Sequence, residues 1–140
     1  MIELINLQPK YRIRRAPFKS LLTFLIDYYK LNDPEVTLVF VDTKTIRRLN
    51  KKFLKKNRPT DVLSFPFGEK KSSDGKSYLG DIVISVPQAF KQCLPKTHGL
   101  EKELLDLTVH GFLHLLGFDH GQGLEEEEAK TDRLLAEIYK

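Results

Sequence analysis

The segment at residues 100–117, LEKELLDLTVHGFLHLLG, places the strongest constraint on the fold. Its large apolar residues are spread around most of the circumference of a helix: Leu104, Leu105, Leu107, Val109, Phe112, Leu113, Leu115 and Leu116. An ordinary surface helix carries a single apolar stripe, so a helix of this kind needs other elements packed on several of its sides. The sequence therefore predicts a long and largely buried helix from about Leu100 to Leu116.

The segments around it alternate between strand and helix patterns. Runs rich in β-branched and other apolar residues predict strands at residues 1–7, 35–41, 60–67 (TDVLSFPF, a buried strand broken by Pro66) and 78–86. Helices are predicted from Ala16 to Lys30, after Pro87, and at residues 124–139. The polar segment 68–77 predicts a turn between two antiparallel strands. The predicted fold is α+β: residues 1–140 form a single-domain layered sandwich with a small mixed sheet of about four strands packed by helices.

Composition limits the class of protein to which the chain can belong and its expected location in the cell. A hydrophobic content of 41% beside 30% charged residues is typical of a soluble globular protein. No apolar run approaches the ~18 residues that a membrane span needs, and the N-terminus lacks the pattern of a signal peptide. The single cysteine, Cys93, excludes an internal disulfide and cannot build a thiolate metal site alone. We therefore expect a cytoplasmic protein with no membrane association.

Charge is distributed unevenly along the chain. Residues 1–76 carry a net charge of +9 and residues 77–140 a net charge of −5. The segment 44–58 has no acidic residue and eight basic residues: Lys44, Arg47, Arg48, Lys51, Lys52, Lys55, Lys56 and Arg58. Ile46, Leu49 and Phe53 recur on a separate stripe, which predicts an amphipathic helix with a cationic face. The basic residues are predicted to bind an RNA backbone; the alternative is a solvated surface helix.

Three of the four histidines lie in the stretch HGFLHLLGFDH, at residues 110–120. His110 and His114 are four residues apart on the predicted helix, so they project from the same face. Gly117 suits the left-handed conformation that ends a helix and returns His120 toward the first two. The alternative is three separate hydrogen-bonded core histidines, but one shared pattern favours a metal site at the end of the buried helix. His98 lies outside the pattern and is predicted to be structural or solvent-facing.

Zinc is the predicted ion, because three imidazoles with an open fourth position are typical of catalytic zinc sites. Nickel, copper and iron also bind imidazole. A metal-bound water with its pKa lowered toward ~7 would be the nucleophile of a hydrolase. The spacing matches the metzincin peptidase pattern H-E-x-x-H-x-x-G-x-x-H except at Gly111, where those enzymes carry a glutamate base. A zinc peptidase therefore stays as a weakened alternative.

Three ordered motifs resemble the YbeY family of endoribonucleases, also described as ribosomal RNA maturation factors. They are HGFLHLLGFDH, RPTDVLSFPF at residues 58–67 and LGDIVIS at residues 79–85. The resemblance implies a metal-dependent, single-strand-specific endoribonuclease that matures the 3′ end of small-subunit ribosomal RNA and acts in ribosome quality control. By the same resemblance, the metal ligands are His110, His114 and His120.

The chain departs from the family pattern at two places. Phe118 stands where a tyrosine is more usual. Phe53–Leu54 stands where the family usually has an aromatic–arginine pair, and that arginine is thought to engage RNA or assist catalysis. Lys55, Lys56 or Arg58 can replace the charge, although a lysine does not reproduce the bidentate phosphate binding of an arginine.

The predicted function is therefore metal-dependent hydrolysis of RNA, because a metal ion and nearby cationic side chains suit a phosphodiester without a glutamate base. The expected partners are ribosomal RNA and components of the small ribosomal subunit. Besides the peptidase, one alternative is a non-catalytic RNA-binding ribosome-assembly factor whose metal is structural. In that protein, Asp119 or a distant residue would close the fourth position.

Overall fold

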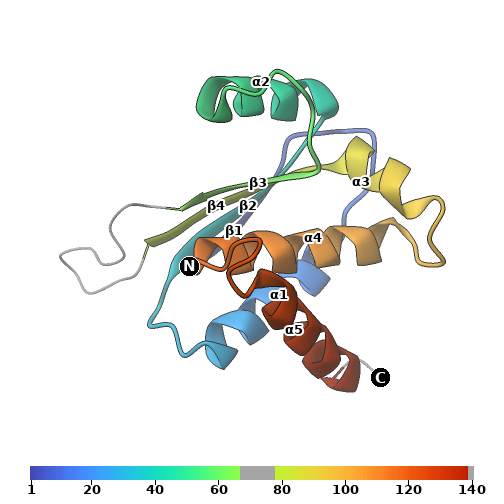
Figure 1. The fold of residues 1–140 in the computed structure, drawn as a ribbon. Coiled ribbons are helices and arrows are strands. Elements are labelled where there is room, and N and C mark those ends of the chain that lie inside the picture. The colour runs from blue at the N-terminus through green and yellow to red at the C-terminus, as the bar shows by residue number, and fades with distance from the viewer. Residues whose placement is uncertain (67–77, 139–140) are drawn as a thin grey trace.

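The computed structural model describes residues 1–66 and 78–138, and the predicted turn at 68–77 lies outside them. The elements follow one another in the order β1 (Ile2–Asn6), α1 (Arg15–Tyr28), β2 (Glu35–Val41), α2 (Thr43–Leu54), β3 (Val62–Pro66), β4 (Tyr78–Ser85), α3 (Val86–Cys93), α4 (Leu100–Leu115) and α5 (Leu124–Ile138) (Figure 1). No helix in this part of the chain combines the length and apolar character needed to cross a membrane.

The strands form one mixed sheet in the order β1-β2-β4-β3. β1 pairs in parallel with β2, and β2 pairs in parallel with β4, so that Leu38 lies between Leu4 and Ile82. Parallel neighbours need a crossover connection, and α1 supplies the one between β1 and β2. β3 pairs antiparallel with β4, as predicted for the two strands on either side of segment 68–77. The predicted α+β class and mixed four-stranded sheet are confirmed.

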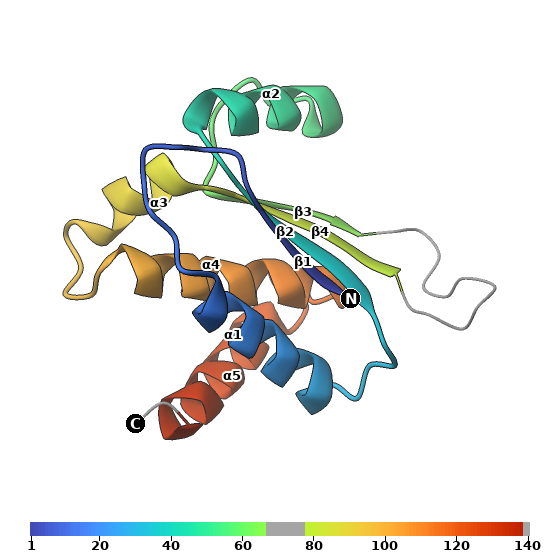
Figure 2. The ribbon, with the colours of Figure 1, turned by 180° about the vertical axis from the view of Figure 1, so that it is seen from behind.

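Alternate residues of each strand face two different layers of helices. Val36, Leu38 and Phe40 of β2 belong to the larger core, which also takes in buried residues of α1 and α4. Val41 and Val83 face the other way and pack with Ile46 of α2 in a smaller cluster. Both ribbon views accordingly place α1, α4 and α5 on one side of the sheet and α2 on the other (Figures 1 and 2).

The predicted long helix is α4, and it is buried as expected. Leu104, Leu107, Val109, Phe112, Leu113 and Leu115 each expose less than a tenth of their surface. Gly111 lies where α4 crosses the sheet: a β-carbon at this position would come within 2.6 Å of Ile82 Cγ2. The Ser64 hydroxyl of β3 donates a hydrogen bond to the Gly111 carbonyl at 3.0 Å. The glycine therefore allows the close approach that holds α4 against β3 and β4.

Three local predictions need correction. The helix expected across the basic segment ends at Leu54, because Lys55 adopts a left-handed conformation (φ 61°) and the Lys56 amide then donates to the Asn50 carbonyl at 3.2 Å. The sequence predicts Phe53 on the buried stripe, but it is 53% exposed, because it lies in the last turn, where it packs edge-on against Phe65 and beneath the Lys52 ammonium. The strand predicted as buried, β3, is an edge strand in which Leu63 alone is buried.

Candidate metal centre

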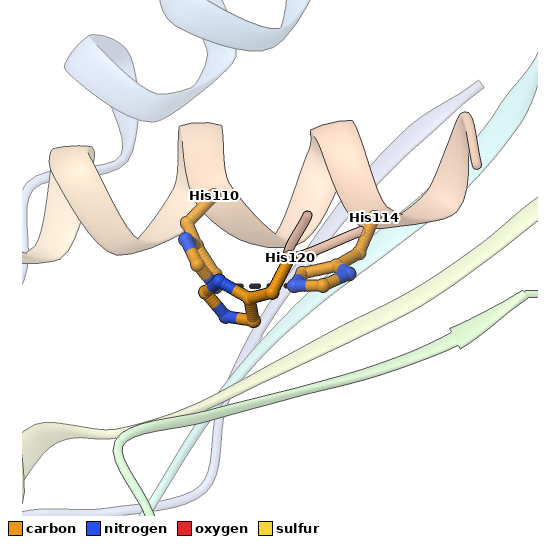
Figure 3. Close-up of side chains that lie close together, drawn as sticks. All are labelled: His110, His114 and His120. Atoms are coloured by element: carbon orange, nitrogen blue, oxygen red, sulfur yellow. Dashed lines mark hydrogen bonds between the residues drawn. The ribbon is translucent and has the colours of Figure 1, made fainter. Parts of the chain in front are cut away.

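The three histidines of the motif converge on one point. His110 and His114 project from consecutive turns of α4, and His120 comes back from the turn that follows the helix (Figure 3). The Nε2 atoms of His110 and His114 are 3.2 Å apart, and one nitrogen from each of the three rings lies within 4.8 Å of the other two. Two ligands of a tetrahedral zinc ion at about 2.0–2.1 Å would be about 3.3–3.4 Å apart. The donor set and its spacing therefore fit a divalent ion.

Glycine makes the return of His120 possible. Gly117 has φ 100°, so it takes the left-handed conformation that the sequence predicts at the end of α4. The Phe118 amide then donates to the Leu113 carbonyl at 3.1 Å, which caps the helix. Leu124, which is fully buried, anchors the start of α5 directly after the turn. The turn bearing His120 is thus fixed at both of its ends.

Each imidazole also contacts a carboxylate through its outer nitrogen, a feature that sequence reasoning missed. His110 Nδ1 lies 2.5 Å from Glu128, His114 Nδ1 lies 2.9 Å from Asp119, and His120 Nδ1 lies 2.9 Å from Glu125. The acidic run at 125–128 is visible in the sequence, but nothing in it indicates which glutamates turn toward the histidines. The hydrogen bond from His120 holds the pKa of Glu125 below its usual value.

Asp119 is a candidate for the fourth ligand, and its position argues against that role. Its carboxylate contacts Nδ1 of His114, the nitrogen on the side of the ring away from the converging Nε2 atoms. Within residues 1–66 and 78–138, no cysteine or carboxylate joins the three histidines in a group that could hold a metal. A bound ion would therefore keep a position open for a water molecule or a substrate.

The position of the peptidase glutamate is occupied by close packing. Gly111 is buried on the side of α4 that packs against the sheet, and an added β-carbon would come too close to Ile82 and Ser64. A glutamate there would have to displace the sheet, so this fold has no room for the general base of the metzincin pattern. The peptidase alternative loses further support.

The predicted RNA-binding residues do not lie together with the histidines. All eight basic residues of 44–58 are exposed. Lys44, Arg47, Arg48, Lys51 and Lys52 lie on α2, on the opposite side of the sheet from α4 (Figure 1). Lys55, Lys56 and Arg58 lie in the loop that leads into β3, which Asn50 holds through a 2.9 Å hydrogen bond from its side-chain amide to the Arg58 carbonyl. Leu54, at the family's arginine position, is 49% exposed.

His98 is structural, one of the two roles expected for it. Its Nε2 atom lies 2.9 Å from Glu103, a buried glutamate that also accepts hydrogen bonds from Lys96 and Gln92. Burial raises the pKa of Glu103, but these three partners outweigh that effect and hold the pKa below its usual value. This network joins the start of α4 to α3 and takes no part in the histidine cluster.

The fold and the histidine cluster define a small α+β protein with a three-imidazole site, a candidate metal centre, at the end of a buried helix. A family model described as Endoribonuclease YbeY matches residues 5–139. The chain belongs to this family. Two proteins named Endoribonuclease YbeY are similar to it: one from Aquifex aeolicus, 42% identical over 85% of this chain and 78% of that protein, and one from Acholeplasma laidlawii, 39% identical over 91% and 89%.

A solved structure supports the same fold. The solution structure of a protein from Thermotoga maritima aligns with 93% of this chain and 85% of its own, with a TM-score of 0.61 and 28% identity. The family match and this structural similarity agree with the resemblance expected from the three sequence motifs.

Proposed function

We propose that this protein is a metal-dependent, single-strand-specific endoribonuclease that works in the cytoplasm on the 3′ end of small-subunit ribosomal RNA and in ribosome quality control. His110, His114 and His120 would hold one Zn²⁺ ion. The observation that carries the proposal is the convergence of these three imidazoles in a chain that belongs to the Endoribonuclease YbeY family.

The chemistry of the site suits a phosphodiester. A bound ion would supply positive charge to a phosphate and lower the pKa of a water molecule toward ~7. The three imidazoles would provide the ligands, and no cysteine or carboxylate among the described residues joins them as a fourth. Phosphoryl transfer depends mainly on positioning and charge stabilisation, so the absence of a glutamate at Gly111 is no obstacle to it.

The basic residues are proposed to bind the RNA backbone outside the metal centre. Because α2 and α4, which carries His110 and His114, lie on opposite sides of the sheet, an RNA strand that touches both has to pass around the sheet. We propose a path over the edge strand β3, against which α4 packs through the Ser64–Gly111 hydrogen bond. Lys55, Lys56 and Arg58 precede that edge strand in the chain, and their exposed side chains would meet the RNA there. This route suits an extended single strand better than a rigid duplex.

The test incubates zinc-loaded protein in parallel with a single-stranded RNA of the small-subunit 3′ region and with an unstructured polypeptide. We expect cleavage of the RNA alone, and its loss on addition of a chelator and in the His114→Ala variant. Cleavage of the polypeptide would support the peptidase instead. RNA binding without any cleavage would indicate an assembly factor with a structural metal.

A further inference from the structure

Three carboxylates surround the histidine triad on the side away from the converging nitrogens. Glu125 and Glu128 lie on α5, and Asp119 lies in the turn that carries His120. Each contacts the Nδ1 atom of a different imidazole, so no histidine of the triad lacks an acidic partner. Three independent contacts of one kind, contributed by two segments, point to a shared role.

We propose that Glu128, Asp119 and Glu125 are positioning residues of the metal site, with Glu128 the most important. The inference rests on the proposed metal site and names residues that determine its affinity. A carboxylate can only accept a hydrogen bond, so it holds the imidazole proton on Nδ1. The Nε2 lone pair is then free to bind an ion, and the negative charge behind the ring makes that nitrogen a stronger donor.

The assignment also bears on the contact between His110 and His114. With their protons held on Nδ1, the two rings present unprotonated Nε2 atoms to each other at 3.2 Å. Two lone pairs at that distance repel each other, and a cation bound by both removes the repulsion. The outer carboxylates thus prepare the inner side of the triad for a positive ion.

Solvent exposure sets the expected order of the three pairs. In the His110–Glu128 pair the side chains are 24% and 33% exposed, whereas the values are 25% and 59% for His114–Asp119 and 69% and 63% for His120–Glu125. Water and salt screen an exposed ion pair more strongly than a shielded one. Removing the charge of Glu128 should therefore weaken metal binding most, and removing that of Glu125 least.

The experiment measures the zinc affinity of each variant by competition with a chromophoric chelator. Glu128→Gln should bind Zn²⁺ about 10–100-fold more weakly than the unsubstituted protein, Asp119→Asn should show a smaller loss, and Glu125→Gln the smallest. Glu126→Gln is the matched control. It removes the same charge from the same turn of α5, and Glu126 is exposed and has no hydrogen bond or ion pair among the described residues.

Melting curves in excess chelator separate positioning from simple packing, because they report on the protein without metal. A Glu128→Gln variant with lower stability but unchanged zinc affinity would overturn the proposal, as would an equal loss of affinity in Glu126→Gln. If Glu128→Gln fails to fold, the test uses Asp119→Asn instead, because Asp119 lies in an exposed turn. A zinc affinity of Asp119→Asn equal to that of the Glu126→Gln control would then refute the positioning role of the carboxylates. An unsubstituted protein that binds no zinc overturns this inference and the proposed function together, whereas one that binds zinc but cleaves no RNA overturns the proposed function alone.

Discussion

Gly111 determines how closely α4 lies against the sheet. Its neighbours His110 and Phe112 lie in the histidine cluster and in the core, so a small shift of the helix would move both. Glycine in a helix interior costs roughly 1 kcal/mol relative to alanine, and here that cost is offset by the packing it allows. The motif thus combines three proposed metal ligands with a glycine that the packing of α4 requires.

We expect Gly111→Ala to destabilise the protein by about 1–3 kcal/mol, since overpacking outweighs the gain in helix propensity. The new β-carbon would come within 2.6 Å of Ile82 Cγ2. A double-mutant cycle with Ile82→Ala, followed by chemical denaturation, isolates the contact. The loss caused by Ile82→Ala should be smaller in the Gly111→Ala variant than in the unsubstituted protein; strict additivity would show that the two positions do not meet.

Glu103 should make stability depend on pH. Its pKa is lower in the folded protein, so the ionised carboxylate stabilises the fold above its unfolded pKa of about 4.3, and this stabilisation is lost as pH falls through the folded value. Glu103→Gln should cost about 1–3 kcal/mol at pH 7. The difference from the unsubstituted protein should shrink in acid. Urea denaturation at pH 7 and pH 3.5 measures it, and a pH-independent difference would exclude a contribution from ionisation.

Helix α2 is the element that presents most of the unbalanced positive charge. Asp42 caps its first turn, accepting a 2.8 Å hydrogen bond from the Thr45 amide, and Ile46 fixes it to the sheet. The side chains of Lys51 and Lys55 are exposed and have no hydrogen bond or ion pair among the described residues. The structure therefore leaves both side chains available to a polyanion.

Replacing Lys51 and Lys55 with glutamine should weaken the binding of unrelated single-stranded RNAs about equally, since phosphate contacts carry no sequence information. Each lost contact should make the log–log salt dependence of the association constant shallower by ~0.7. Titrations of a labelled RNA at several salt concentrations measure the slope. Lys19→Gln, an exposed lysine of α1 on the other side of the sheet, is the control. An unchanged slope in the double variant would remove α2 from the RNA-binding surface.

Across the whole molecule, the ion should link the metal centre to stability, because an ion that binds the folded state preferentially shifts the folding equilibrium. At a free zinc concentration of about 100 times the dissociation constant the gain is about 2.7 kcal/mol, or roughly 5–10 °C in melting temperature. Melting with and without a chelator at neutral pH measures this shift. A chelator should not change the melting temperature of the variant in which all three histidines are replaced by alanine. A shift equal to that of the unsubstituted protein would mean that the ion binds elsewhere.

Much of this architecture could be predicted from the sequence, because it depends on local patterns. The β-branched runs identified the strands, the leucines identified α4, and the four-residue spacing with Gly117 brought His120 back to His110 and His114. The strand order could not be predicted, since β4 inserts between β2 and β3 only through tertiary packing. The contacts of Glu125 and Glu128 with the histidines could not be predicted either. An acidic run at 125–128 is also typical of a solvent-exposed helix, and only the packing of α5 beside α4 brings these two side chains to the histidines.

Dependence of RNA cleavage on an ion held by the three histidines is tested by titrating the metal-free protein with Zn²⁺ while the initial rate of single-stranded RNA cleavage is followed. We expect the rate to rise with added zinc and to level off at about one ion per chain, as for a single three-histidine site. The variant with His110, His114 and His120 replaced by alanine should stay inactive throughout. Cleavage that is independent of added zinc, or that persists in this variant, would show that the three histidines do not hold a catalytic ion.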